Sequence, residues 1–125
     1  MKYEVTIPIP PSVNQLYRNV AGKGRASTRK YRQWKADVTW LLINELPKLV
    51  APVKIGVTIK GGTGFRRNSD ISNRIKATED ALVAAGRLED DNVQHVTEVR
   101  ARYFPPEGKE RATCILSIID SAEGE

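Results

Sequence analysis

The chain has 125 residues, of which 40% are apolar and 28% charged, and its 20 Lys and Arg against 15 Asp and Glu give a net charge of +5. This length suits one domain with one hydrophobic core, and the composition excludes a disordered or fibrous protein. A lone cysteine, Cys114, excludes an internal disulfide framework, and a lone histidine, His95, argues against a histidine-based zinc site. No stretch approaches the roughly 20 apolar residues of a membrane span, and no apolar leader opens the sequence, so we expect a cytoplasmic protein without a membrane partner.

Positive charge is concentrated in the N-terminal third of the chain. No acidic residue occurs between Glu4 and Asp37, and this stretch contains Arg18, Lys23, Arg25, Arg29, Lys30, Arg32 and Lys35. Residues 120–125, in contrast, form an acidic tail that we expect to fray. Concentrated positive charge is typical of a surface that binds nucleic-acid phosphates, although a solvated loop and helix face would show the same pattern.

The first half of the sequence predicts a strand, a loop, a helix and a second strand. Residues 2–8 alternate polar and apolar side chains, as a strand with one buried face does, and a proline-rich segment ends them. Residues 12–25 are expected to form a basic loop. Ser27 or Thr28 then caps a helix that runs to about residue 46 and buries Trp34, Val38 and Leu42. Residues 53–60 alternate again and predict a strand.

The second half predicts another loop, a second helix and two more strands. Glycines open the loop at residues 61–68, and the helix at residues 70–85 has Ser69 or Asp70 as its N-cap and Gly86 at its end. Strands are expected at residues 93–103 and 112–119, joined as a hairpin by the turn between them. The order β-α-β-α-β-β predicts an α/β or α+β fold, with a mixed sheet and two helices in one domain over residues 1–125.

Two acidic segments could carry chemistry. Asp70, Asn73, Lys76 and Asp80 lie on one polar stripe of the second predicted helix, and the run Glu89-Asp90-Asp91 follows that helix. Clustered carboxylates suit a hard cation such as Mg²⁺, which can activate water for attack on a phosphodiester. The alternatives are structural, since Asp70 could serve only as a helix cap and the acidic run only as a solvated turn. Composition and spacing alone therefore indicate a nucleic-acid-binding metal site as one of several possibilities.

Three short motifs occur in order along the chain. The first is the proline-rich segment at residues 7–14, Ile-Pro-Ile-Pro-Pro-Ser-Val-Asn, followed by Tyr17. The second is Asp-Ile-Ser-Asn-Arg-Ile-Lys at residues 70–76, followed by Asp80-Ala81-Leu82. The third is Leu-Glu-Asp-Asp-Asn-Val-Gln at residues 88–94. In their order and spacing, over nearly the whole chain, the three motifs resemble the RusA family of Holliday junction resolvases, in which the second motif has the pattern Asp-x-Asp-Asn-x-x-Lys.

The resemblance implies a homodimer that cuts four-way DNA junctions by paired symmetric nicks with Mg²⁺ or Mn²⁺ and no small-molecule cofactor. Members of this family are often encoded by phages and prophages, and the sequence leaves a phage, prophage or host origin open. It implies that Asp70 and Asp91 bind the metal and act in catalysis, that Lys76 contacts the phosphate, and that Asp90 is a neighbour or further ligand of the metal. The basic residues are then expected to hold DNA; they are Arg18, Lys23, Arg25, Arg29, Arg66 and Arg67, together with Lys76. Phe65 could wedge against a base or pack inside its own loop.

Ser72 departs from the family pattern, which has aspartate at this position. Serine keeps a small oxygen ligand but lacks the negative charge. The substitution could be an engineered inactivation, or it could mark a natural relative that binds junctions without cutting them. A third explanation is that Asp90, or less readily Asp80, replaces the missing ligand. A protein of another class, with a merely solvated basic face, is the remaining alternative.

Overall fold

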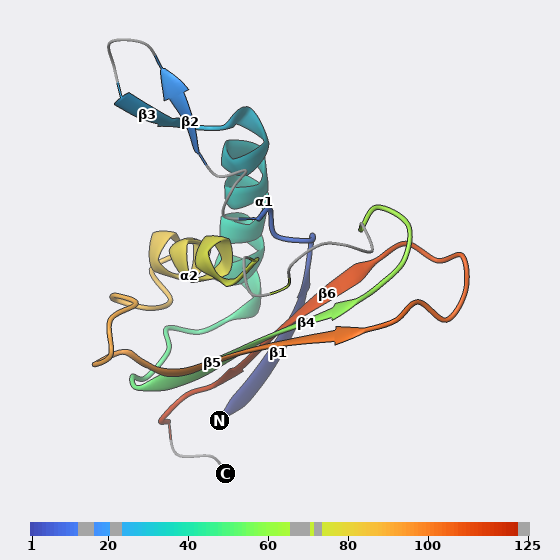
Figure 1. The fold of residues 1–125 in the computed structure, drawn as a ribbon. Helices are drawn as coiled ribbons and strands as arrows, with labels where there is room; N and C mark the ends of the chain where they lie inside the picture. The colour runs from blue at the N-terminus through green and yellow to red at the C-terminus, as the bar shows by residue number, and fades with distance from the viewer. Residues whose placement is uncertain (13–16, 21–23, 66–70, 72–73, 123–125) are drawn as a thin grey trace.

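A computed structural model describes residues 1–12, 17–20, 24–65, 71 and 74–122, with the backbone alone for residues 17–20 and 24–25. The helices are α1 (Arg29–Glu45) and α2 (Ile75–Ala84). The strands are β1 (Lys2–Ile7), β2 (Tyr17–Val20), β3 (Gly24–Ser27), β4 (Val53–Lys60), β5 (Val96–Phe104) and β6 (Thr113–Ile119). Figure 1 shows both helices beside one twisted sheet, with β2 and β3 apart from it at the beginning of α1.

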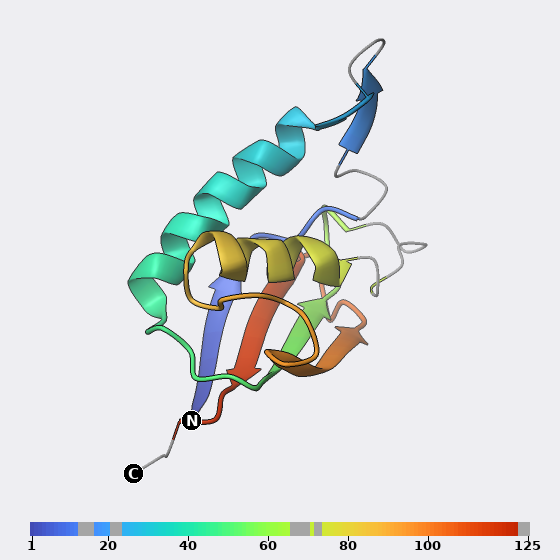
Figure 2. The ribbon, with the colours of Figure 1, turned by 90° about the vertical axis from the view of Figure 1, so that its left-hand side faces the viewer.

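Four strands form a mixed sheet in the order β1-β6-β4-β5. The pairs β1–β6 and β6–β4 are antiparallel, and β4–β5 is parallel. Both helices cover the same face of this sheet (Figure 2). The predicted α+β fold with a mixed sheet and two helices is therefore confirmed.

The hydrophobic core lies between that face and the helices. Alternate residues of the central strands are buried, for example Ile55 and Ile59 on β4 and Leu116 on β6. They pack with Leu42 of α1 and Leu82 of α2, which are fully buried. The period of two in the strands places every second side chain in the core. The other side chains lie on the opposite, open face, which no described helix covers.

The predicted hairpin of the last two strands is wrong. Strand β4 lies between β5 and β6, so β5 is an edge strand that pairs only with β4 among the described residues. The burial of these strands explains the arrangement: β6 buries Cys114, Leu116 and Ile118 as a central strand does, whereas nearly all of β5 is exposed. The parallel pair β4–β5 needs a long crossover, and α2 provides it.

Two further boundaries differ from the sequence prediction. The expected loop at residues 12–25 contains β2 and the first two residues of β3, and these two strands pair in antiparallel fashion. Helix α2 begins at Ile75, later than predicted, and the amide of Arg74, just before it, donates to the Ile71 carbonyl. The expected cap at Ser69 or Asp70 lies outside the described residues. Helix α1, in contrast, begins as predicted, because the Thr28 hydroxyl accepts a hydrogen bond from the Tyr31 amide.

The end of β6 is anchored by Asp120, the first residue of the acidic tail. Its side chain is buried and accepts hydrogen bonds from the backbone amides of Val50 and Ala122, both at 3.1 Å. It also pairs with the N-terminal ammonium group at 3.5 Å. This carboxylate therefore ties both ends of the described chain to the loop that follows α1.

Gly86 terminates α2 with a left-handed backbone, φ +68°. The amides of Arg87 and Leu88 both donate to the Leu82 carbonyl, which closes the helix and turns the chain back.

We expect Gly86→Ala to lower the free energy of unfolding by about 1–2 kcal/mol, because nothing crowds an added Cβ and the cost is the left-handed conformation itself. Gly108→Ala is the control, since Gly108 is equally uncrowded but lacks a positive φ. It should change stability by less than about 0.5 kcal/mol in urea denaturation. Equal effects of the two substitutions would contradict this role of Gly86.

Candidate active site

Lys76 lies between two carboxylates that come from different parts of the chain. It stands in the first turn of α2, and its Nζ is 3.0 Å from Asp80 Oδ1, one turn further along the helix. The same Nζ is 3.4 Å from Asp91 Oδ2, in the segment that precedes β5. The structure thus brings together Lys76 and Asp91, two of the predicted site residues, and adds Asp80.

Asp91 reaches Lys76 because the chain doubles back after α2. Figure 2 shows residues 87–95 returning beneath the helix before they enter β5. A compact set of turns holds this segment, in which Asn92 accepts from the amides of His95 and Val96 through its backbone carbonyl. The helix and the acidic segment, which are separated in sequence, therefore meet at one place.

Asp90 supports this turn. One of its carboxylate oxygens accepts from the Asp91 amide at 2.7 Å, and the other accepts from the Asn92 side-chain amide at 3.1 Å. Both oxygens are therefore already hydrogen-bonded within the turn. Asp91, whose side chain is one-third exposed, directs one carboxylate oxygen toward Lys76 instead.

Tyr31 connects the cluster to α1. This tyrosine is buried, and its hydroxyl donates to Asp80 Oδ2 at 3.0 Å. Asp80 is thus held from one side by Tyr31 and from the other by Lys76. The role of Tyr31 was not predicted, whereas the polar stripe of the helix had already placed Asp80 on the same face as Lys76. The aromatic ring one turn before Trp34 was the available sequence signal, but it indicates only burial.

The charges of the cluster influence one another. The hydrogen bond that Lys76 donates to Asp80 is the largest cause that raises the pKa of Lys76, and the negative charge of Asp91 adds to it, so the ammonium form is favoured. The pKa of Glu79, a residue that no sequence pattern singled out, is also raised, first by its partial burial and then by the charge of Asp91. The cluster therefore keeps one cation among several acidic groups.

The described carboxylates are of a kind that binds divalent cations, but by themselves they do not form a complete metal site. Within residues 74–122 and the other described parts, no three His, Cys, Asp or Glu side chains lie close enough to hold a metal. Asp91 can supply carboxylate oxygen, which Mg²⁺ prefers. A complete centre requires donors from outside the described residues, where Asp70 and Ser72 lie.

The predicted DNA-binding residues are only partly visible. Arg29 is exposed at the beginning of α1. Arg18 and Arg25 lie on β2 and β3, of which the backbone alone is described. Lys23, Arg66 and Arg67 lie outside the described residues.

A basic pocket beside the start of α2 was not predicted. Its charged lining consists of Lys30, Arg74 and Arg111. The uncharged lining comes from the exit of β1, from residues 63–64 and from Ala112. Arg74 also donates to the Pro10 carbonyl at 2.9 Å. The sequence separates these three cations by tens of residues, so no local pattern reveals the pocket.

Phe65 is held by packing contacts. Its ring stacks on Tyr103 with a centroid separation of 5.8 Å, and the Arg74 guanidinium lies 5.1 Å from the ring centroid. The contacts favour the packing interpretation over a wedge that inserts between bases.

Cys114 and His95 take no part in this cluster. Cys114 is buried in β6, and burial raises the pKa of its thiol to about 12, so the thiolate is not available as a nucleophile. His95 lies in the turn before β5, not in the strand as expected, and contacts Asn92 Oδ1 at 2.9 Å. No helix in the described part of the chain is long and apolar enough to cross a membrane.

Known proteins with related sequences support the resemblance. The sequence matches the family described as Endodeoxyribonuclease RusA over residues 8–113. The crossover junction endodeoxyribonuclease RusA of Shigella sonnei (strain Ss046) is 32% identical over 89 residues, which cover 71% of this chain and 73% of that protein.

Two other relatives have the same name. The crossover junction endodeoxyribonuclease RusA of Escherichia coli O139:H28 (strain E24377A / ETEC) is 33% identical over 105 residues, or 82% of this chain and 83% of that protein. The protein of Enterobacteria phage 82 is 29% identical over 89 residues, or 71% and 73%. The range that matches the family includes all of the described cluster, from Tyr31 to Asp91. The chain therefore belongs to the RusA family of endodeoxyribonucleases.

Proposed function

We propose that this chain is a structure-specific DNA endonuclease that resolves four-way junctions in recombination and repair. The observation that carries the proposal is the position of Lys76 against Asp91, which lie in two of the three family motifs. The basic pocket includes Arg74, two residues before Lys76. The lysine can meet the negative charge of a phosphodiester, and the carboxylate can serve a cation there. Relatives named crossover junction endodeoxyribonucleases supply the substrate class.

In this proposal Lys76 contacts the phosphate that is cut. An ammonium group acts as a compact point charge, and its neighbours Asp80 and Asp91 keep it protonated. Asp80 holds the side chain of Lys76 in place, and Tyr31 holds Asp80. The Lys76 side chain is therefore already ordered before DNA binds. Asp80 and Tyr31 are positioning residues.

Asp70 and Asp91 are proposed to hold a Mg²⁺ ion, for which Mn²⁺ can substitute. When bound, the ion supplies Lewis-acid charge stabilisation and lowers the pKa of a coordinated water. Asp90, whose oxygens are engaged in the turn, contributes chiefly by fixing the segment that carries Asp91. If the turn at residues 90–92 opens, Asp90 is the proposed third ligand of the metal.

The DNA backbone is proposed to follow the basic residues around the start of both helices. The exposed Arg29 and the pocket formed by Lys30, Arg74 and Arg111 are described parts of this path. The remaining proposed contacts come from the sequence, namely Arg18, Lys23, Arg25, Arg66 and Arg67. Such contacts supply affinity through phosphate neutralisation and counterion release.

A homodimer would explain paired symmetric nicks. A four-way junction presents two equivalent strands, and a two-fold dimer places one active site on each. A relative from a phage is consistent with an origin in a phage or prophage, and the lone buried cysteine suits the reducing cytoplasm.

Ser72 favours a second function, a junction-binding protein with impaired cleavage. The position is two residues after Asp70, where the family pattern has a carboxylate. Without that charge the metal is held more weakly, whereas the basic residues that bind DNA are unchanged. Binding and cutting are then separable in this chain.

We expect Ser72→Asp to raise the rate at which a labelled synthetic four-way junction is cut in Mn²⁺ by at least about tenfold, the lower bound for restoring a group that supports a metal. Binding to the junction without metal should change little. If the unaltered chain already cuts as fast as the variant, another ligand replaces the missing carboxylate. If neither cuts although both bind, the nuclease proposal is wrong and the binding function stands.

We expect Asp80→Asn to reduce cleavage by about 10- to 100-fold, because Lys76 loses the carboxylate that holds it and small misplacements of a catalytic group have effects of this size. The rate should be measured in the most active background, Ser72→Asp if that variant is the faster. Tyr31→Phe, which removes only the hydroxyl that bonds Asp80, should give a smaller loss in the same direction.

Asp37→Asn is the matched control for Asp80→Asn. It makes the same chemical change on an exposed side chain of α1 that bonds only Gln33 among the described residues, and it should leave cleavage unchanged. Equal losses in Asp80→Asn and Asp37→Asn would indicate a general effect of charge on DNA binding and would contradict the positioning role.

A further inference from the structure

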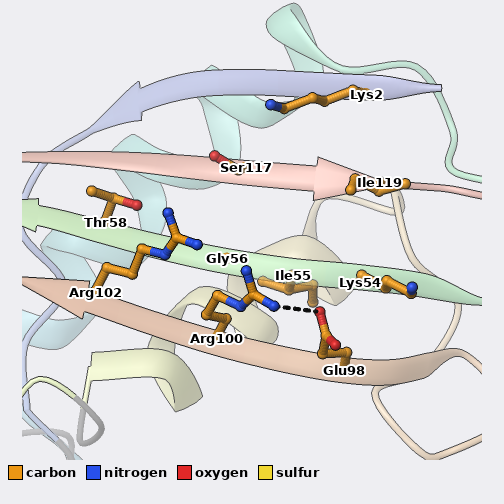
Figure 3. Close-up of a pocket in the computed structure, with 10 residues that line it drawn as sticks. All are labelled: Lys2, Lys54, Ile55, Gly56, Thr58, Glu98, Arg100, Arg102, Ser117 and Ile119. Carbon is orange, nitrogen blue, oxygen red and sulfur yellow. Dashed lines mark ion pairs between the residues drawn. The ribbon is translucent and has the colours of Figure 1, made fainter.

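The open face of the sheet carries a second concentration of positive charge, on the side opposite to the helices. A pocket in this face is surrounded by Lys2 of β1, Lys54 of β4, and Arg100 and Arg102 of β5. Figure 3 shows the two guanidinium groups reaching from β5 across β4. Glu98 is the one carboxylate in the lining, so cations dominate it.

Small residues form the floor of this pocket. Gly56 pairs with Arg100 on one side and Ser117 on the other, and a Cβ added at Gly56 would meet nothing closer than 3.7 Å. The absence of bulk in the central strands leaves room for the arginine side chains to lie over β4. An anionic group can therefore approach between cations that three strands supply.

Two of the four cations are not neutralised by neighbouring acids. Arg100 pairs with Glu98 at 3.8 Å and Lys2 with Glu4 at 3.5 Å, and all four of these side chains are about half exposed or more. Among the described residues, no carboxylate lies within ion-pairing distance of Lys54 or Arg102. These two side chains are available to phosphate oxygens.

We propose that this open face binds the phosphate backbone of a second arm of the junction, an inference that rests on the proposed function. A polyanion complements the charge of the face, whereas a second copy of the chain would bring the same cations against it. The occupant is therefore DNA, not another protomer. The candidate active site and this face lie on opposite sides of the sheet, so they contact different stretches of DNA.

Strand β5 connects the two DNA-binding surfaces. The segment that contains Asp91 leads directly into this edge strand, whose Arg100 and Arg102 belong to the open face. A straight duplex is stiff over about 150 bp and cannot lie against both faces of a sheet. The diverging arms of a junction can do so, and the second surface therefore contributes to the preference for branched over linear DNA.

The double variant Lys54→Ala/Arg102→Ala tests this inference. Binding to a four-way junction and to a linear duplex of the same sequence is measured without divalent metal over a series of salt concentrations. We expect the junction dissociation constant to rise about tenfold or more, with a salt dependence shallower by about 0.9 for each phosphate that the protein no longer neutralises. The duplex dissociation constant should change less, so the preference for the junction falls.

The double variant Lys48→Ala/Lys109→Ala is the control, because it removes two exposed lysines outside the pocket. It should keep the preference for the junction. The inference is overturned if Lys54→Ala/Arg102→Ala binds the junction normally, weakens both DNAs equally, or changes the oligomeric state in light scattering. If the unaltered chain binds neither DNA, the proposed function itself fails, which is a distinct result.

Discussion

The sheet of this protein can be buried on one face only, and the rest of the structure follows from that constraint. In β4 and β6 every second residue is a large aliphatic or a cysteine, and the intervening positions are Lys, Gly, Thr, Ser or exposed Ile. Both helices must therefore pack on the same side. The helix side receives the core and the Lys76 cluster, and the opposite side keeps its charged residues in solvent.

The crossover from β4 to β5 positions the residues of the candidate active site. Parallel neighbours cannot be joined by a tight turn, so the chain must cross the sheet between them, and it does so through α2. Gly86 ends the helix, and the following segment returns beneath it, which places Asp91 against Lys76. The crossover that joins the parallel strands thus also brings Lys76 and Asp91 together, although they are fifteen positions apart in the sequence.

Local patterns in the sequence predicted where helices and strands occur better than they predicted which of these elements lie side by side. Helix α1 begins as expected because Thr28 caps it and Trp34, Val38 and Leu42 recur at helical spacing. The neighbours of β5 were mispredicted, because a period of two tells which face is buried but not which strand lies alongside. The family resemblance alone placed Lys76 and Asp91 in one site, without predicting that they touch. The bridge through Tyr31 and Asp80 depends on how α1 meets α2, which no local pattern encodes.

The Lys76 cluster already holds more negative than positive charge. Asp80 and Asp91 share one cation, Lys76, and the charge of Asp91 raises the pKa of Glu79. In the proposed active site, a carboxylate at position 72 would add to this negative charge, and a bound cation would offset it. Serine at this position is therefore expected to lower the affinity for metal without adding repulsion when no metal is bound.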